Sequence, residues 1–173
     1  EYLVNDLLTL SAIESKGETL QLEKIPLTSV INPVLHLFKD RLENKHVRLN
    51  LNIPEGLPDI SLDRIKMEQV ILNLLDNAIK FTPSGGNISV QASLEHDFLR
   101  IDVKDTGIGI EPKHLPHLFE RFYRVDKGRS RELGGTGLGL SIVKHILQMH
   151  DGRVAVESDV GQGSIFSLFI PIT

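Results

Sequence analysis

Residues 63–82 carry the sequence DRIKMEQVILNLLDNAIKFT, which predicts one long amphipathic helix. Asp63 stands directly before the apolar pattern, where its side chain can cap the N–H groups of a first helical turn. Apolar residues then recur every three or four positions, as on the buried face of a helix. They are Met67, Val70, Ile71, Leu74, Leu75 and Ala78. The segment should therefore be helical to about residue 81 and pack against a core.

Three polar residues of this helix share one face, because Asn73, Asn77 and Lys80 are spaced i, i+4 and i+7. Two asparagines one turn apart cost stability, since asparagine is a poor helix former. One interpretation is a solvated polar face. The other is a ligand site, in which amide oxygens bind Mg²⁺ and the lysine supplies a charge for phosphate.

The segments on both sides of this helix predict a mixed order of strands and helices. The expected strands are 18–26, 47–53, 88–94, 99–103, 154–156 and 164–171. The other expected helices are 29–44, 111–119 and 137–149. Pro33 either starts the helix at 29–44 after an Asn32 cap or kinks it. The two central strands should form an antiparallel hairpin with a turn near His96-Asp97.

This order predicts the fold class α+β, a two-layer sandwich with one mixed, mostly antiparallel sheet and helices on one face. The chain has 173 residues, 40% hydrophobic and 24% charged, which is typical of one folded domain. A net charge of −4 argues against nucleic acid as a partner. Because the chain has no cysteine, disulfides, thiolate metal sites and cysteine nucleophiles are excluded. No apolar run approaches the ~20 residues that span a bilayer.

The first residues predict a separate helix over 1–15, with Leu3, Leu7 and Leu10 on one face. Glycine at position 17 is a typical helix terminator. This helix either packs on the core or is the end of a helical bundle whose remainder is missing. Because the chain begins at Glu1 and not at methionine, we interpret it as a fragment, with a helical stub at 1–16 and a folded domain at 17–173.

Two glycine clusters suggest places where a ligand approaches the backbone. The first, Asp105 to Ile110, follows a strand and contains Gly107 and Gly109, which permit positive φ. The second, 134–140, leads into a helix, where exposed N–H groups attract phosphate. A plain glycine turn or a hinge with a helix cap are the alternatives. Neither cluster fits a P-loop or a dinucleotide-binding fingerprint.

The segment between these clusters is rich in aromatic and cationic residues. Phe119, Phe122 and Tyr123 are candidate apolar anchors, and the cations are Arg121, Arg124, Lys127, Arg129 and Arg131. A solvated loop is one interpretation. A lid that closes on a polyphosphate is the other, since a long charged loop flanked by glycines suits that role.

Together these segments resemble the ATP-binding catalytic domain of sensor histidine kinases, within the superfamily of gyrase, the ninety-kilodalton heat-shock chaperone and MutL. The resemblance implies the Bergerat fold. It covers nearly all of 20–171 and depends on four boxes in the family's order and spacing. They are the N box Asn73–Thr82, the first glycine box Asp105–Gly109, the F box Leu118–Arg124 and the second glycine box Gly135–Leu140. The lid is most similar to those of phosphate-sensing and cell-wall-sensing kinases.

The resemblance implies that ATP and Mg²⁺ are the cofactors. It implies catalytic roles for Asn73, Asn77, Lys80 and Arg124, with Asn77 as the Mg²⁺ ligand. The implied nucleotide-binding residues are Asn73, Asn77, Lys80, Phe81, Asp105, Gly107, Gly109, Arg124, Gly135, Thr136, Gly137, Leu138 and Gly139. Asp105 would bind the adenine amino group, and Phe81 would pack near the adenine. Lys80 and Arg124 would contact phosphate.

One position separates the branches of this superfamily. The members that hydrolyse ATP usually carry glutamate where this chain has Asn73. A carboxylate at this position can activate water as a base, whereas an amide cannot. This favours phosphoryl transfer to a protein. None of the seven histidines lies in the expected acceptor context. The acceptor should therefore belong to a dimerisation and phosphotransfer domain, which would pass the phosphoryl group to a response regulator.

The resemblance further implies a cytoplasmic domain of a homodimeric membrane kinase, whereas the fragment itself should be monomeric. Two other classes of function stay open. One is a non-catalytic nucleotide-binding or docking module, against which the four complete boxes argue. The other is a chaperone-like or topoisomerase-like ATPase, which Asn73 and the short chain disfavour.

Overall fold

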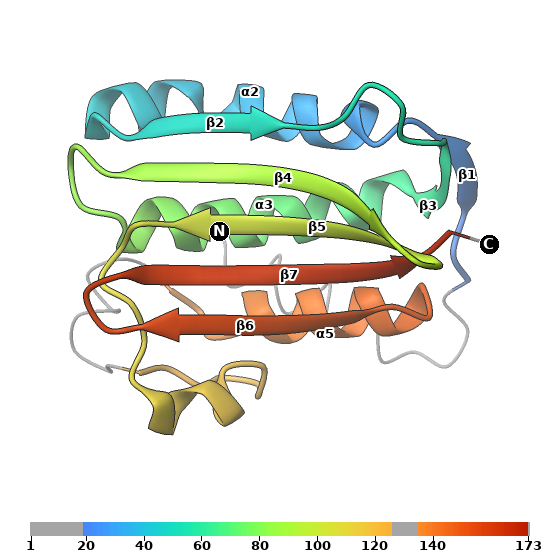
Figure 1. The fold of residues 1–173 in the computed structure, drawn as a ribbon. Helices are drawn as coiled ribbons and strands as arrows, with labels where there is room; N and C mark the ends of the chain where they lie inside the picture. The colour runs from blue at the N-terminus through green and yellow to red at the C-terminus, as the bar shows by residue number, and fades with distance from the viewer. Residues whose placement is uncertain (1–18, 126–134, 173) are drawn as a thin grey trace.

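The computed structural model describes residues 19–125 and 135–172. They form two layers, a five-stranded sheet and a layer of helices on one of its faces (Figure 1). The strand order is β2-β4-β5-β7-β6. These strands are β2 (Arg48–Asn52), β4 (Asn87–Glu95), β5 (Phe98–Asp105), β7 (Gly163–Pro171) and β6 (Arg153–Asp159). The predicted α+β sandwich is confirmed.

Within this sheet, three of the four strand pairs are antiparallel. β4 and β5 form the predicted hairpin around His96-Asp97, and β7 pairs with both β5 and β6. β2 pairs in parallel with β4 at one edge. The central pair places Asp105, the last residue of β5, directly opposite Ser164 near the start of β7. This register brings two distant parts of the chain together at one end of the sheet.

A second sheet of two strands was not predicted. β1 (Leu22–Ile25) pairs in antiparallel fashion with β3 (Ile60–Asp63). The expected strand at 18–26 is shorter in the structure, and its Leu22 is exposed while Ile25 is buried. β3 has only four residues and follows a stretch broken by prolines, so its sequence carries too few positions for an alternation to stand out.

Within the described residues, three α-helices cover the sheet. They are α2 (Thr28–Lys45), α3 (Arg64–Phe81) and α5 (Gly139–Met149). A 3₁₀ helix, Pro112–His117, lies where a short helix was expected. α2 begins before Asn32, so Asn32 is not its cap and Pro33 lies inside the helix. α3 begins as predicted, because the Asp63 side chain accepts a hydrogen bond from the Lys66 N–H.

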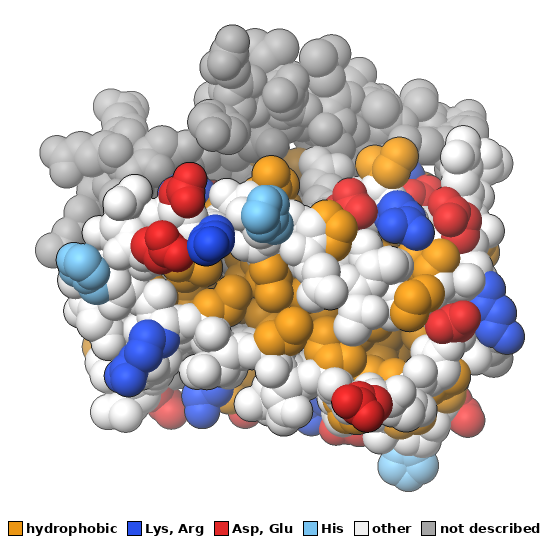
Figure 2. Space-filling model, turned by 90° about the horizontal axis from the view of Figure 1, so that it is seen from above, with side chains coloured by type: hydrophobic (Ala, Val, Ile, Leu, Met, Phe, Trp, Pro, Cys, Tyr) orange, Lys and Arg blue, Asp and Glu red, His pale blue; other side chains and the backbone are white. Residues whose placement is uncertain are grey.

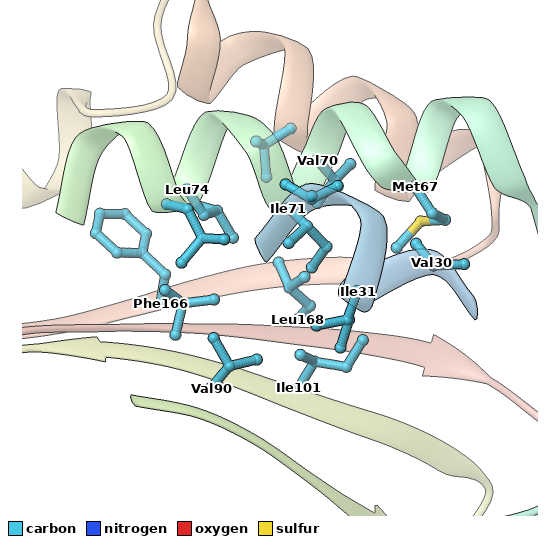
Figure 3. Packing of buried hydrophobic residues seen from close by; sticks show 14 of the residues in the cluster. Val30, Ile31, Met67, Val70, Ile71, Leu74, Val90, Ile101, Phe166 and Leu168 are labelled. Atoms are coloured by element: carbon cyan, nitrogen blue, oxygen red, sulfur yellow. The ribbon is translucent and has the colours of Figure 1, made fainter. Parts of the chain in front are cut away.

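The core lies between the helices and the inner face of the sheet. The apolar side of α3 points at the strands, with Met67, Ile71 and Leu74 fully buried (Figure 3). Leu168 of β7 and Ile101 of β5 contribute from below and are likewise inaccessible to solvent. Burial of each such side chain stabilises the fold by about 1.5–3 kcal/mol. α3 is therefore held firmly in the middle of the helical layer.

The side of the molecule formed by α2 and β2 carries a band of apolar side chains (Figure 2). A groove opens there, lined by Asn32, Leu35, His36, Lys39, Leu42, Glu43, Val47 and Leu49. These residues come from α2, β2 and the link between them, so the groove is separate from the candidate ligand residues of α3. No helix in the described part of the chain is long and apolar enough to cross a membrane.

Candidate functional site

The C-terminal end of α3 is fixed by three hydrogen bonds from two donor residues. Lys45, the last residue of α2, donates from its ammonium group to the carbonyl oxygens of Ile79 and Lys80. The carbonyl of Phe81 accepts from the N–H of Ile108 at 3.3 Å. Carbonyls in the last turn of a helix have no partner within that helix, so these contacts hold the end of α3 in place. The first glycine box is thereby attached to the N box.

Asn73 joins the other end of the N box to the second glycine box. Its side-chain nitrogen donates to the carbonyl oxygen of Gly139 at 3.3 Å. A Cβ added at Gly139 would lie 3.5 Å from the Asn73 side chain, so the two segments are in contact. Both are half-buried. The N box and the second glycine box are therefore adjacent in the structure.

Asn77 and Lys80 lie further along the same face of α3, as predicted. Asn77 is half-buried. The Lys80 ammonium lies 2.6 Å from Asp76, whose other carboxylate oxygen lies 2.8 Å from Arg41 of α2. The cation expected to contact phosphate thus already has an anionic partner. Asp76 was not predicted to be a partner of Lys80, although the i, i+4 spacing of the two residues indicated such a pair.

Asp105 is buried at the end of β5, with 6% of its surface exposed. Burial raises the pKa of this carboxyl, and hydrogen bonds from the backbone N–H groups of Gly107 and Ser164 partly oppose that shift. The Gly107 bond is 2.7 Å long. A carboxylate held by two N–H donors in a dry position has a fixed orientation, and perturbed carboxyls of this kind are concentrated at functional sites.

The two glycines of the first box are required by contacts within the chain itself. A Cβ at Gly107 would lie 2.6 Å from the carbonyl oxygen of Phe81, and one at Gly109 would lie 2.0 Å from that of Asp159. Gly109 also has φ of +69°. The sequence had suggested close approach of a ligand. The structure adds a requirement of the fold itself, because the turn at 107–110 is packed between the end of α3 and the turn linking β6 to β7.

The second glycine box begins outside the helix. α5 starts at Gly139, so Gly137 lies before it and not in its first turn as expected. Gly137 has φ of +77°, and its carbonyl accepts from the N–H of Phe122 at 2.9 Å. Thr136 accepts from the N–H of Leu138, which is buried. Gly135 is half-buried at the edge of the described part.

The F box reaches this box through Phe122, which is 62% exposed and has φ of +62°. A Cβ at Gly137 would lie 2.9 Å from the Phe122 backbone, so glycine allows the two segments to touch. Arg124 is half-buried two residues further on. The rest of the predicted lid, 126–134, and the predicted helix at 1–15 lie outside the described residues.

One set of polar residues was missed by sequence reasoning. Ser158 of β6, Ser164 of β7 and Asp105 of β5 lie side by side across the sheet. The residues beside them in the next row are Val156, Phe166 and Val103. Serine at an inward position of an otherwise apolar strand was the available signal, because such a hydroxyl needs a partner.

The donors present suit a magnesium–nucleotide complex better than a metal ion held by the protein alone. Within 19–125 and 135–172 no cluster of three His, Asp or Glu side chains could bind a metal. The amide oxygens on α3 are neutral oxygen ligands, which Mg²⁺ accepts together with phosphates and water. The buried carboxylate and the glycine-rich backbone lie around the same end of the helical layer.

Comparisons with known proteins agree with this arrangement. A family model described as "Histidine kinase-, DNA gyrase B-, and HSP90-like ATPase" matches residues 62–173. The sensor histidine kinase WalK of Bacillus subtilis is 39% identical over 171 residues, which is 98% of this chain and 28% of WalK. The alginate biosynthesis sensor protein KinB of Pseudomonas aeruginosa is 38% identical, over 98% of this chain and 28% of KinB.

Solved structures show the same fold. Full-length ShkA in complex with AMPPNP superposes with a TM-score of 0.88 at 30% identity, over 99% of this chain and 35% of ShkA. The histidine kinase ThkA in complex with the response regulator TrrA superposes with a TM-score of 0.76 at 25% identity, over 98% of this chain and 49% of that one. The chain thus spans less than half the length of each of these four proteins.

Proposed function

Because the chain belongs to the family of histidine kinase-, DNA gyrase B- and HSP90-like ATPases, we propose that it binds Mg-ATP and transfers the γ-phosphoryl group to a histidine. It is a catalytic domain of the sensor histidine kinase type. The accepting histidine would belong to a dimerisation and phosphotransfer domain of the parent protein. From there the phosphoryl group would pass to the receiver domain of a response regulator.

One observation carries this proposal: α3 contacts both glycine boxes. Phe81, the last residue of α3, accepts a hydrogen bond from the N–H of Ile108. Asn73, eight residues earlier in the helix, donates a hydrogen bond to the carbonyl of Gly139. Amide side chains, a buried carboxylate and glycine-rich backbone thus belong to segments that are in contact with one another. These are the groups that suit a cation, an amino-bearing base and a polyphosphate, respectively.

In this arrangement Asp105 would accept from the adenine amino group, and Phe81 would pack near the base. Asn77, supported by Asn73, would hold a Mg²⁺ ion that neutralises phosphate charge and orients the reacting oxygens. The backbone of 135–139 would wrap the phosphates. Phe81 is 40% exposed, so its ring has a free surface for this contact.

Two cations would contact phosphate directly. Arg124 would do so from the F box. Lys80 would have to leave Asp76 or share itself between that carboxylate and phosphate, because the two groups are 2.6 Å apart in this structure. Binding of ATP would thus include exchange of one anionic partner for another.

Asn73 supports transfer over hydrolysis. Its amide cannot accept a proton, and its nitrogen is committed to the carbonyl of Gly139. A water molecule near the γ-phosphate would therefore have no base at this position. The competing function, a chaperone-like or topoisomerase-like ATPase, would need such a base.

Three features of the parent protein follow from the same proposal. The chain would be the cytoplasmic part of a membrane-bound homodimer and would itself be monomeric. Residues 1–16 would be the end of a phosphotransfer-domain helix, with the folded domain at 17–173. The lid would belong to the phosphate-sensing or cell-wall-sensing type.

A labelling experiment tests the proposal. The purified chain should bind ATP more tightly with Mg²⁺ than without it, and should label a supplied phosphotransfer domain on histidine when given ATP with a radioactive γ-phosphate. Asn77→Asp and Asp105→Ala should abolish labelling. Asn52→Asp, the same change at an exposed position of β2, should not.

The outcomes separate the three functions. Mg-ATP binding without labelling of any acceptor would indicate a non-catalytic module. Rapid release of inorganic phosphate by the chain alone would indicate an ATPase. Labelling that survives Asp105→Ala would show that the site has been misplaced.

A further inference from the structure

The polar row of Ser158, Ser164 and Asp105 ends the apolar inner face of the sheet. Residues directly opposite each other on antiparallel strands project their side chains to the same face. Asp105 is opposite Ser164, and Ser164 is opposite Ser158. Ser164 is 6% exposed and Ser158 is half-buried. Hydroxyl groups in such positions must be hydrogen-bonded, so the arrangement of their hydrogens can be worked out.

The hydroxyl oxygen of Ser158 has three neighbours at hydrogen-bonding distance. The N–H of Ile110 donates to it at 2.9 Å. The carbonyl oxygen of Gly163 and the hydroxyl oxygen of Ser164 each lie 2.9 Å away. Ser158 therefore links Ile110, directly after the first glycine box, to the start of β7, where the backbone N–H of Ser164 supports the Asp105 carboxylate.

Counting donors and acceptors assigns the hydrogens. A serine hydroxyl has one hydrogen and two lone pairs. The carbonyl of Gly163 can only accept, so all three contacts of Ser158 are satisfied in one way. Ser158 donates to Gly163, and its two lone pairs accept from Ile110 and from the Ser164 hydroxyl. The Ser164 hydroxyl then donates its only hydrogen to Ser158, and its lone pairs remain available as acceptors.

We propose that Ser158 is a positioning residue for base recognition, because it makes the Ser164 hydroxyl an acceptor on the same sheet face as Asp105. This inference rests on the proposed binding of an adenine nucleotide at Asp105, and it concerns the preference of that site for adenine over guanine. Two neighbouring acceptors favour a purine that presents an amino group. Adenine carries the N6 amino donor where guanine carries the O6 acceptor.

Without Ser158 the hydroxyl of Ser164 is free to rotate. It can then donate a hydrogen to the O6 carbonyl of guanine, and the penalty against GTP falls. If discrimination falls by the contribution of one neutral hydrogen bond, the ratio of the ATP and GTP affinities changes by about 3-fold to 10-fold. The affinity for ATP itself should change less than this ratio does.

The experiment measures Mg-ATP and Mg-GTP affinities by isothermal titration calorimetry for five forms of the chain. These are the wild type, Ser158→Ala, Ser158→Thr, Ser93→Ala and Asp105→Ala. Ser158→Thr keeps the hydroxyl and should keep the wild-type ratio. Ser93 is exposed on the opposite face of the sheet and is the matched control. Thermal unfolding checks that each variant is folded.

The expected result is an ATP-to-GTP affinity ratio that falls about 3-fold to 10-fold in Ser158→Ala alone among the serine variants. If the ratio is unchanged in Ser158→Ala, or both affinities fall equally, Ser158 is merely structural and the inference is wrong. A wild type that shows no preference for ATP, or a preference that survives Asp105→Ala, would instead overturn the proposed binding at Asp105 and this inference with it.

Discussion

Gly109→Ala should destabilise the folded chain far more than an alanine at a comparable turn glycine nearby. The new Cβ would lie 2.0 Å from the carbonyl oxygen of Asp159, a backbone atom that cannot move without shifting the turn between β6 and β7. The residue would also keep a φ of +69°. The left-handed conformation costs about 1–2 kcal/mol, and the forced overlap adds about 1–3 kcal/mol.

Gly161→Ala is the matched control, because Gly161 lies in the turn that contacts Gly109. Its φ is +79°, but a Cβ there would meet nothing within 4 Å. Only the conformational cost of about 1–2 kcal/mol should appear. Gly56→Ala, with open space and no positive φ, should be close to neutral.

Urea unfolding measures these differences as shifts of the midpoint at constant slope. With a slope of about 2 kcal/mol per molar urea, Gly109→Ala should lower the midpoint by about 1–2.5 M, and Gly161→Ala by no more than about 1 M. Equal shifts in the two variants would show that contact with Asp159 is not the reason for glycine at 109. The packing argument for the first glycine box would then be refuted.

Three further predictions use the charged groups around the site. The pKa of Asp105 is raised in the folded state, so from about pH 3.8 upward the folded state binds more protons than the unfolded state. The free energy of unfolding should therefore fall as the pH rises through that range. Denaturation curves of Asp105→Ala at several pH values should lack this dependence. Lys45→Met should cost about 1–3 kcal/mol in thermal unfolding, because two carbonyls at the end of α3 lose their donor; exposed Lys39→Met should cost little, and similar losses would contradict the capping role. Asp76→Asn should raise ATP affinity about 2-fold to 5-fold in calorimetry by releasing Lys80 from its ion pair, whereas weaker binding would show that Asp76 helps to position the lysine.

Local patterns predicted most of the elements, but not β3 and not all of the contacts between elements. The cap at Asp63 and the turn near His96-Asp97 depend on neighbours in sequence, and the structure confirms both. The pairing of β1 with β3 depends on residues far apart, such as Leu22 and Asp63. No local periodicity encodes such a contact, so this second sheet could not be predicted.

The candidate site shows the same division. Spacing along one helix predicted that Asn73 and Asn77 share a face. The contact of Asn73 with Gly139 joins distant segments of the chain, and no spacing pattern encodes it. Serine at position 158 was a visible signal in the sequence, but its hydrogen-bond partners depend on cross-strand register and could not be predicted. The reason for Gly109 was also hidden, since the atom that excludes a side chain belongs to Asp159, fifty residues later in the chain.

The place of β7 between β5 and β6 has a consequence for synthesis on the ribosome. Until residues 163–171 emerge, β5 of a nascent chain has an unpaired side, and Asp105 lacks the backbone N–H of Ser164. An open edge of this kind invites pairing with other chains. Nucleotide-binding capacity should therefore arise only after β7 has been translated, and truncation of the chain ahead of β7 should abolish it.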